Sequence, residues 1–152
     1  MRAIIIGAGP AGLMAAAVLA AAGAQLGITV EVFDAMPSAG RKFLMAGKSG
    51  LNLTHAEPGE KFVARYGQRS DWVAPWLREF DADALRDWAR GLGVETFVGS
   101  SGRVFPQDMK AAPLLRAWLH RLRAGGVRFH MRHRWLGWEG ENLLFASPDG
   151  NV

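Results

Sequence analysis

At residues 4–12 the chain reads Ile4-Ile5-Ile6-Gly7-Ala8-Gly9-Pro10-Ala11-Gly12, an apolar strand that runs directly into a Gly-x-Gly-x-x-Gly turn before an alanine-rich helix. Gly7 permits the tight turn, Gly9 lets bare backbone approach a pyrophosphate, and Gly12 lets the helix press against the sheet. Free amides and the positive end of the helix dipole favour anionic phosphates there. The stretch therefore predicts a dinucleotide-binding turn, with candidate contacts from Gly7 through Gly12, Ala8, Pro10 and Ala11 included.

A second strand is predicted at residues 28–34, which read Ile-Thr-Val-Glu-Val-Phe-Asp. Asp34 ends this strand about 20 residues after the turn, where the dinucleotide fingerprint requires an acid. A carboxylate there accepts hydrogen bonds from the ribose hydroxyls of an adenosine. Glu31 is the competing acid, but it lies in the middle of the strand and points away from Val30 and Val32. We predict Asp34, with Ala35 beside it, as the ribose site; the alternative is a solvated carboxylate.

Length and composition indicate a globular protein without a membrane span. The 152 residues suffice for one domain with a core. The stretch between Ala3 and Val30 has no charge, but Pro10 and four glycines interrupt it. The absence of cysteine fits a cytoplasmic protein. Four scattered histidines give no zinc spacing, so we expect no metal site and interpret His130 and His133 as surface polar residues.

An arginine-rich segment near the end of the chain raises the question of nucleic-acid binding. It contains six arginines and no acid: Arg116, Arg121, Arg123, Arg128, Arg132 and Arg134. Three belong to a predicted helix and three to the strand and turn that follow, so they need not share a face. We expect a solvated face or a partner surface, and no nucleic-acid partner.

Residues 36–54 are glycine-rich, basic and without clear periodicity. A long loop after a ribose-binding strand is typical of a segment that wraps a ligand. Arg41 and Lys42 are placed to reach the second phosphate or a ribityl chain. The amides around residues 47–50 are placed to approach a flat ring.

Two amphipathic helices are predicted next, over residues 72–80 and from a cap at Asp81 to Gly91 or Gly93. We expect them to bury their apolar side chains, in the first helix Trp72, Trp76, Leu77 and Phe80. Four later elements are also predicted: a hairpin of 94–98 with 104–105, a helix ending at Gly125-Gly126, a third parallel strand at 127–130, and an antiparallel hairpin of 135–138 with 143–146.

The predicted fold class is α/β, a Rossmann-like parallel sheet with an inserted helical and hairpin segment and a small antiparallel β-meander. Residues 1–54 form the first part of the dinucleotide-binding domain, and residues 55–108 form the insertion. Residues 109–152 supply a return helix, the third strand and the start of the meander.

Several motifs resemble flavoproteins of the glutathione-reductase structural class: the turn at residues 7–12, Asp34, and the run from Gly40-Arg41-Lys42 through Asn52-Leu53-Thr54. The segment Gly102-Arg103-Val104-Phe105-Pro106 is similar to the middle motif of bacterial FAD-dependent oxidoreductases of the aminoacetone-oxidase and bile-acid-reductase types. The resemblance implies an FAD whose ADP half lies on the turn and Asp34. It places Arg41, Lys42 and Asn52 near the pyrophosphate, ribityl chain or ring, and NAD(P)H is a candidate co-substrate.

The chain also departs from that family. Many relatives have Gly-Gly-Gly-Arg-Cys-Asn where this chain has Gly-Lys-Ser-Gly-Leu-Asn at residues 47–52. They are also longer, with a later Ala-Thr-Gly turn and a C-terminal Gly-Asp segment, neither of which occurs here. We therefore expect the N-terminal part of a longer flavin-dependent oxidoreductase, inactive alone, whose site the rest of its chain completes around a small-molecule substrate.

No residue qualifies as a catalytic acid or base. Lys48 and Arg103 are candidates for groups near the isoalloxazine, and surface charge is the alternative for both. Two other functions stay open: an NAD-dependent dehydrogenase domain, and a non-catalytic fragment or binding module.

Overall fold

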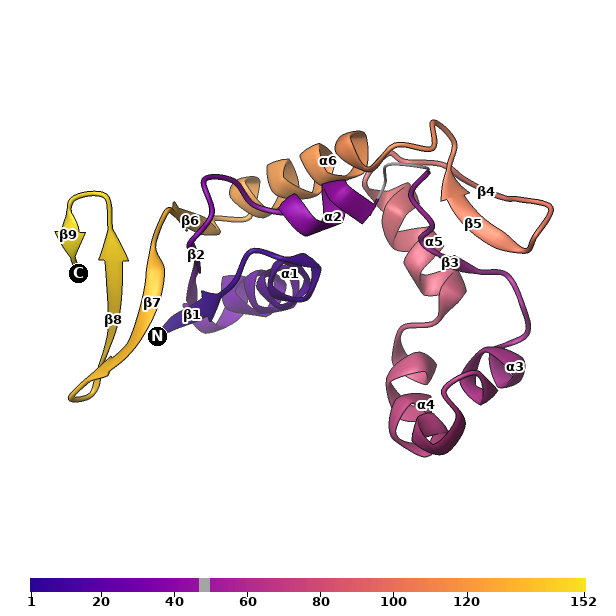
Figure 1. Cartoon of the computed structure of the whole chain (residues 1–152), viewed down its shortest axis with the longest axis horizontal. Coiled ribbons are helices and arrows are strands. Elements are labelled where there is room, and N and C mark those ends of the chain that lie inside the picture. Colours follow the sequence, from indigo (N-terminus) through magenta and orange to yellow (C-terminus); the bar gives the residue numbers. More distant parts are fainter. Residues whose placement is uncertain (47–49) are drawn as a thin grey trace. The chain divides into compact units, whose positions relative to one another are not determined.

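The computed structural model describes residues 1–46 and 50–152 (Figure 1). It divides into two compact units. The first unit consists of Met1–Met45 and Trp118–Val152, and the second of Ala46–Ala117. The functional division at residues 54 and 108 stays a prediction.

The first unit is built on a parallel sheet, and Figure 1 labels its strands. Its strands β1 (Arg2–Ile6), β2 (Thr29–Asp34) and β6 (Arg128–Met131) lie in the order β1-β2-β6. In the register, Ile6 lies beside Phe33, and Asp34 lies beside Met131. Parallel strands need crossover connections, and helices α1 (Pro10–Leu26) and α6 (Ala111–Ala124) precede β2 and β6. The predicted Rossmann-like α/β fold and its third parallel strand are confirmed.

Local sequence explains where these helices begin and end. Pro10 opens α1, where its fixed φ suits the helix and its missing N–H is no loss. The helix ends at Gly27, whose φ of 64° is the left-handed conformation that glycine adopts most readily. Pro113 lies in the first turn of α6, the only part of a helix interior that tolerates it well.

The two faces of β2 have different surroundings in the first unit. Val30 and Val32 are buried, as are Leu13 and Ala16 of α1, the helix that contacts this strand. Glu31 alternates to the opposite side of the strand, as predicted. Phe33, two residues on, shares the side of Glu31, which leaves that side of β2 to be covered by other elements.

A small antiparallel meander provides that cover. Its strands are β7 (Arg134–Glu139), β8 (Asn142–Ser147) and β9 (Gly150–Asn151), in the order β7-β8-β9. Phe145 of β8 is buried, and its ring stacks on Phe33 with centroids 4.4 Å apart. The predicted antiparallel pairing of this segment is confirmed, and its aromatic anchor ties it to β2.

The second unit combines short helices with an antiparallel sheet. The sheet has the order β3 (Thr54–His55), β5 (Arg103–Pro106), β4 (Thr96–Val98). The helical elements lie between β3 and β4 in the sequence. Asp81 caps the helix that follows it, because its Oδ1 accepts a hydrogen bond from the Ala84 amide at 2.8 Å, as predicted. The elements are β3 (Thr54–His55), α3 (Gly59–Ala64), the 3₁₀ helix η1 (Gly67–Arg69), α4 (Ser70–Glu79), α5 (Ala82–Gly91), β4 (Thr96–Val98) and β5 (Arg103–Pro106).

The prediction of one long loop over residues 36–54 is wrong in two places. Helix α2 (Arg41–Ala46) begins after Gly40, whose φ is 71° and whose carbonyl accepts the Leu44 amide. Thr54 starts β3. Arg41-Lys42-Phe43-Leu44-Met45-Ala46 contains good helix formers, but it is too short to show a helical period.

The expected burial of the α4 aromatics is also wrong. Trp72 and Trp76 are 67% and 68% exposed, and Phe80 is 40% exposed. The helix carries more apolar side chains than one packed face can cover, and the half-buried ones are Val73, Ala74 and Leu77. The Arg69 guanidinium lies 4.9 Å from the Trp72 ring centroid, a cation–π contact made at the surface. No helix in the described part of the chain is long and apolar enough to cross a membrane.

Candidate functional site

The glycine turn between β1 and α1 has the geometry that its sequence requires. Gly7 adopts a φ of 107°, and its amide donates to the Phe33 carbonyl at 2.7 Å. A Cβ on Gly12 would lie 1.9 Å from the Gly7 carbonyl oxygen, so no larger residue fits there. The turn and the first helical turn are therefore packed backbone against backbone.

The turn leaves open backbone where an anion would approach. A Cβ on Gly9 would meet nothing within 4 Å. The Leu13 amide donates to the Gly9 carbonyl at 2.9 Å and begins the helical ladder. The amides of Ala11 and Gly12 come before this bond and, like other first-turn amides, have no acceptor within the helix. Amides of this kind, at the positive end of a 17-residue helix, suit a phosphate.

Asp34 lies beside this turn, as predicted. Its Oδ2 accepts a hydrogen bond from the Ala8 amide at 2.6 Å, and its Oδ1 accepts one from the Met36 amide at 2.7 Å. Each carboxylate oxygen has a second lone pair for a further donor. The carboxylate is half-buried and held by two backbone groups, so its position is set before any ligand arrives. Its role as a ribose ligand stays a prediction, as does that of the exposed neighbour Ala35.

The competing acid Glu31 has other partners. Its Oε2 accepts a hydrogen bond from His130 Nε2 at 2.8 Å, and its Oε1 lies 3.9 Å from Arg2 Nε. The residue is only 8% exposed. This arrangement leaves Asp34 as the acid at the glycine turn.

The segment that follows Asp34 returns to the same turn. The Gly40 amide donates to the Ala8 carbonyl at 2.8 Å, so both backbone groups of Ala8 are held by this part of the chain. Arg41 and Lys42 follow as the first two residues of α2, and both side chains are exposed. The two cations therefore directly follow Gly40, the residue that is hydrogen-bonded to the turn, and their contact with a phosphate or ribityl chain stays a prediction.

The remaining predicted residues belong to the second unit or lie outside the described residues. Asn52 is exposed between Leu51, whose amide donates to Met109, and Leu53, whose amide donates to Val104. Arg103 begins β5 and is also exposed. The two motif segments are therefore neighbours in this unit, although about fifty residues separate them in sequence. Their cofactor roles stay predictions, and Lys48 lies outside the described residues.

The interpretation of His130 and His133 as surface polar residues holds only in part, because both rings also pack against Phe33. The His130 ring stacks on Phe33 with centroids 4.3 Å apart and an interplanar angle of 13°, and His133 meets Phe33 edge-on at 5.7 Å. Both histidines are half-buried. The sequence could not identify Phe33 as the partner of His130, because the two residues meet only through the register of β2 with β6 in the parallel sheet.

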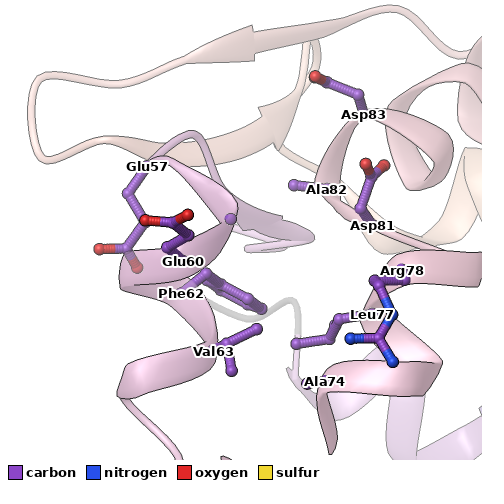
Figure 2. Close-up of a pocket in the computed structure, with 11 residues that line it drawn as sticks. Glu57, Glu60, Phe62, Val63, Ala74, Leu77, Arg78, Asp81, Ala82 and Asp83 are labelled. Atoms are coloured by element: carbon purple, nitrogen blue, oxygen red, sulfur yellow. The ribbon is translucent and has the colours of Figure 1, made fainter.

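A hollow of about 690 Å³ lies in the second unit between α3, α4 and the start of α5. Figure 2 shows Phe62, Val63 and Leu77 near its apolar part. Four carboxylates also line it (Glu57, Glu60, Asp81 and Asp83), together with Arg78. The side chains from Asp81 and Asp83 have structural partners in Ala84 and Arg86, and Glu57 pairs with Arg65. None of the predicted cofactor residues lines this hollow. In the described part of the chain, no group of His, Asp or Glu is arranged to hold a metal ion.

The fold and the turn define a dinucleotide-binding Rossmann domain. The chain belongs to the HI0933-like protein Rossmann domain family, whose model matches residues 1–148. This is a family of FAD-binding oxidoreductases. No curated protein matches the sequence.

Solved structures of similar fold are much longer than this chain. The open conformation of a flavocytochrome c3 fumarate reductase is 18% identical with a TM-score of 0.69, and the match covers 100% of this chain and 31% of that chain. Adenosine-5-phosphosulfate reductase in complex with sulfite is 16% identical with a TM-score of 0.63, and the match covers 96% of this chain and 28% of that chain. 3-ketosteroid-delta4-(5alpha)-dehydrogenase from Rhodococcus jostii RHA1 is 14% identical with a TM-score of 0.62, and the match covers 98% of this chain and 42% of that chain. At such identities the likeness shows the fold alone.

Proposed function

We propose that this chain is the FAD-binding N-terminal part of a flavin-dependent oxidoreductase. The observation that carries the proposal is the 2.6 Å hydrogen bond between Asp34 Oδ2 and the Ala8 amide. It holds an acid beside an open, glycine-lined helix start, which is the arrangement that recognises the ribose and diphosphate of an adenine dinucleotide. Family membership favours FAD as that dinucleotide.

The residues of the site fit the ADP half of the cofactor. The space around Gly9 admits an approaching phosphate, and the free first-turn amides of α1 are suited to donate to it. Asp34 is suited to accept from the ribose hydroxyls and to repel a 2′-phosphate. When bound, FAD supplies hydride or electron transfer. The task of this chain is then to hold the nucleotide end in place.

The finer assignment rests on sequence resemblance. We propose that the protein is similar to the aminoacetone-oxidase and bile-acid-reductase types, and that it acts on a small molecule in the cytoplasm with NAD(P)H as a candidate co-substrate. Arg41, Lys42 and Asn52 would contact the pyrophosphate, ribityl chain or ring. Because the chain spans 28 to 42% of the three structures described above, the rest of a longer chain would complete the site, and no nucleic-acid partner is proposed.

The flavin proposal is tested by the absorption spectrum of the purified full-length protein. We expect a yellow protein, or one that becomes yellow after incubation with FAD and removal of the excess. A protein that stays colourless would contradict the proposal. Binding of NAD without flavin would instead favour the dehydrogenase alternative, and binding of neither would favour a non-catalytic fragment.

A further inference from the structure

We propose that His130 is a positioning residue for the nucleotide site, acting through β2 on Asp34. The inference rests on the proposed function, because it concerns the affinity of that site for an adenine dinucleotide. His130 acts on the site indirectly, because its side chain contacts Glu31 and Phe33 of β2, the strand that ends in Asp34.

His130 contacts two alternate residues of β2, Glu31 and Phe33. Its Nε2 donates to Glu31 Oε2 at 2.8 Å, and its ring lies parallel to Phe33 with centroids 4.3 Å apart. Phe145 covers Phe33 as well, with centroids 4.4 Å apart and an interplanar angle of 22°. Stacked rings of this kind add stabilisation beyond the area they bury. Phe33 is therefore fixed by β6 and by the meander.

Phe33 is joined to both halves of the nucleotide site through the backbone. Its carbonyl accepts the Gly7 amide at 2.7 Å, which holds the glycine turn. The next residue is Asp34, whose carboxylate accepts the Ala8 amide. A small displacement of the Phe33 peptide would therefore move the phosphate-binding turn and the ribose carboxylate together.

A second link runs through the end of β6. The His133 amide donates to the Asp34 carbonyl at 2.9 Å, and the Arg132 amide donates to the Met36 carbonyl at 3.0 Å. The imidazole of His133 has its Nδ1 2.9 Å from the Met131 carbonyl, so this nitrogen carries the proton. The two residues that follow β6 therefore hold Asp34 and Met36 in place through backbone hydrogen bonds.

The test is a double-mutant cycle on nucleotide affinity in the full-length protein. FAD is titrated into wild type, His130→Ala, Asp34→Ala and the double variant, with the dissociation constant measured by fluorescence or calorimetry. We expect His130→Ala to weaken binding about five- to twentyfold in the presence of Asp34. In the Asp34→Ala background the factor should be smaller, because only the glycine turn is left to be displaced and residues in one network are not additive. Equal factors in both backgrounds, or no effect, would overturn the inference.

Matched variants separate positioning from general damage. His120→Ala removes an exposed histidine from α6 and should leave the affinity unchanged. His130→Gln keeps a donor at the position of Nε2 and should recover part of the lost affinity. If His130→Ala fails to fold, Phe145→Leu removes the ring that covers Phe33 without touching Glu31, and we expect it to weaken binding in the same Asp34-dependent way.

A measurement made without FAD tests the positioning role of His130 independently of the proposed function. Hydrogen exchange of the Ala8 amide reports its bond to Asp34 directly. We expect this exchange to be faster in His130→Ala than in wild type and unchanged in His120→Ala. If wild type binds no FAD, the proposed function fails, and unchanged Ala8 exchange in His130→Ala would separately contradict the positioning role.

Discussion

The glycine turn of the first unit and helix α4 of the second unit both follow from clear sequence patterns, but only the turn has the surroundings that its pattern predicts. At the turn, Gly12 has no room for a side chain and Asp34 lies within hydrogen-bonding distance of Ala8. In α4, the expected core tryptophans Trp72 and Trp76 are exposed.

The difference comes from what each pattern encodes. The turn is specified by steric requirements within a few residues of backbone, which hold wherever the segment is placed. The apolar side chains of α4 specify a helix, but the side that becomes buried depends on what packs against it. Local backbone chemistry is therefore a safer guide to a site than apolar periodicity is to a core. Substitutions in both units can test this contrast.

The largest combined effect on stability and FAD binding is expected for Gly12→Ala. Its Cβ would lie 1.9 Å from a backbone oxygen, so the turn or the helix must move. We expect a loss of about 2–4 kcal/mol in the free energy of unfolding, together with loss of FAD binding. Urea unfolding and flavin titration measure the two effects.

Gly9→Ala is the matched control for that variant. The new methyl group has open space and a permitted backbone conformation, so stability should change by no more than about 1 kcal/mol. FAD binding should still be lost, because the methyl group occupies the approach of the pyrophosphate. Equal destabilisation by the two variants would contradict the assigned division of roles between the glycines.

Asp34→Ala is expected to weaken FAD binding by about 1–3 kcal/mol, because ribose hydroxyls would be left without an acceptor. The measurement is flavin occupancy after dialysis, followed by titration. Asp149→Ala removes an exposed carboxylate in the same unit and serves as the control. Occupancy equal to that of wild type would refute the ribose role.

Gly102→Ala tests the second unit at a position of local backbone constraint. Gly102 has a φ of 78°, and a Cβ there would lie 2.6 Å from the His55 ring, which is itself held by the Ser101 carbonyl and the Glu57 amide. We expect a loss of about 2 kcal/mol. Gly140→Ala, with a φ of 59° and open space, should lose only about 1 kcal/mol in the same thermal or urea unfolding experiment.

The smallest effect is expected for Trp76→Ala. Because this side chain is 68% exposed, the free energy of unfolding should change by less than about 0.5 kcal/mol. Trp118→Ala is the buried counterpart, with a side chain in a residue that is 2% exposed, and should cost about 3–5 kcal/mol. A large loss in the free energy of unfolding for Trp76→Ala would instead support the buried position that sequence periodicity predicted.

Sequence patterns predicted the parallel sheet, the return helix and the place of Asp34, because strand alternation and glycine requirements act over short distances. They missed α2, which is shorter than two turns and too brief to display a period. They also missed the His130–Glu31 contact, which joins residues 99 positions apart and depends on the register of two parallel strands. Asn52 and Arg103 were identified by resemblance, and their roles stay predictions.

In the proposed site, the diphosphate of FAD binds the amino end of α1 while its ribose binds Asp34. The most direct measurement is the change in backbone amide resonances when FAD is added to the full-length protein. We expect the largest shifts at Ala8, Gly9, Ala11 and Gly12, and we expect these shifts to be lost in Gly9→Ala. Saturable binding that leaves these amides unchanged would contradict it.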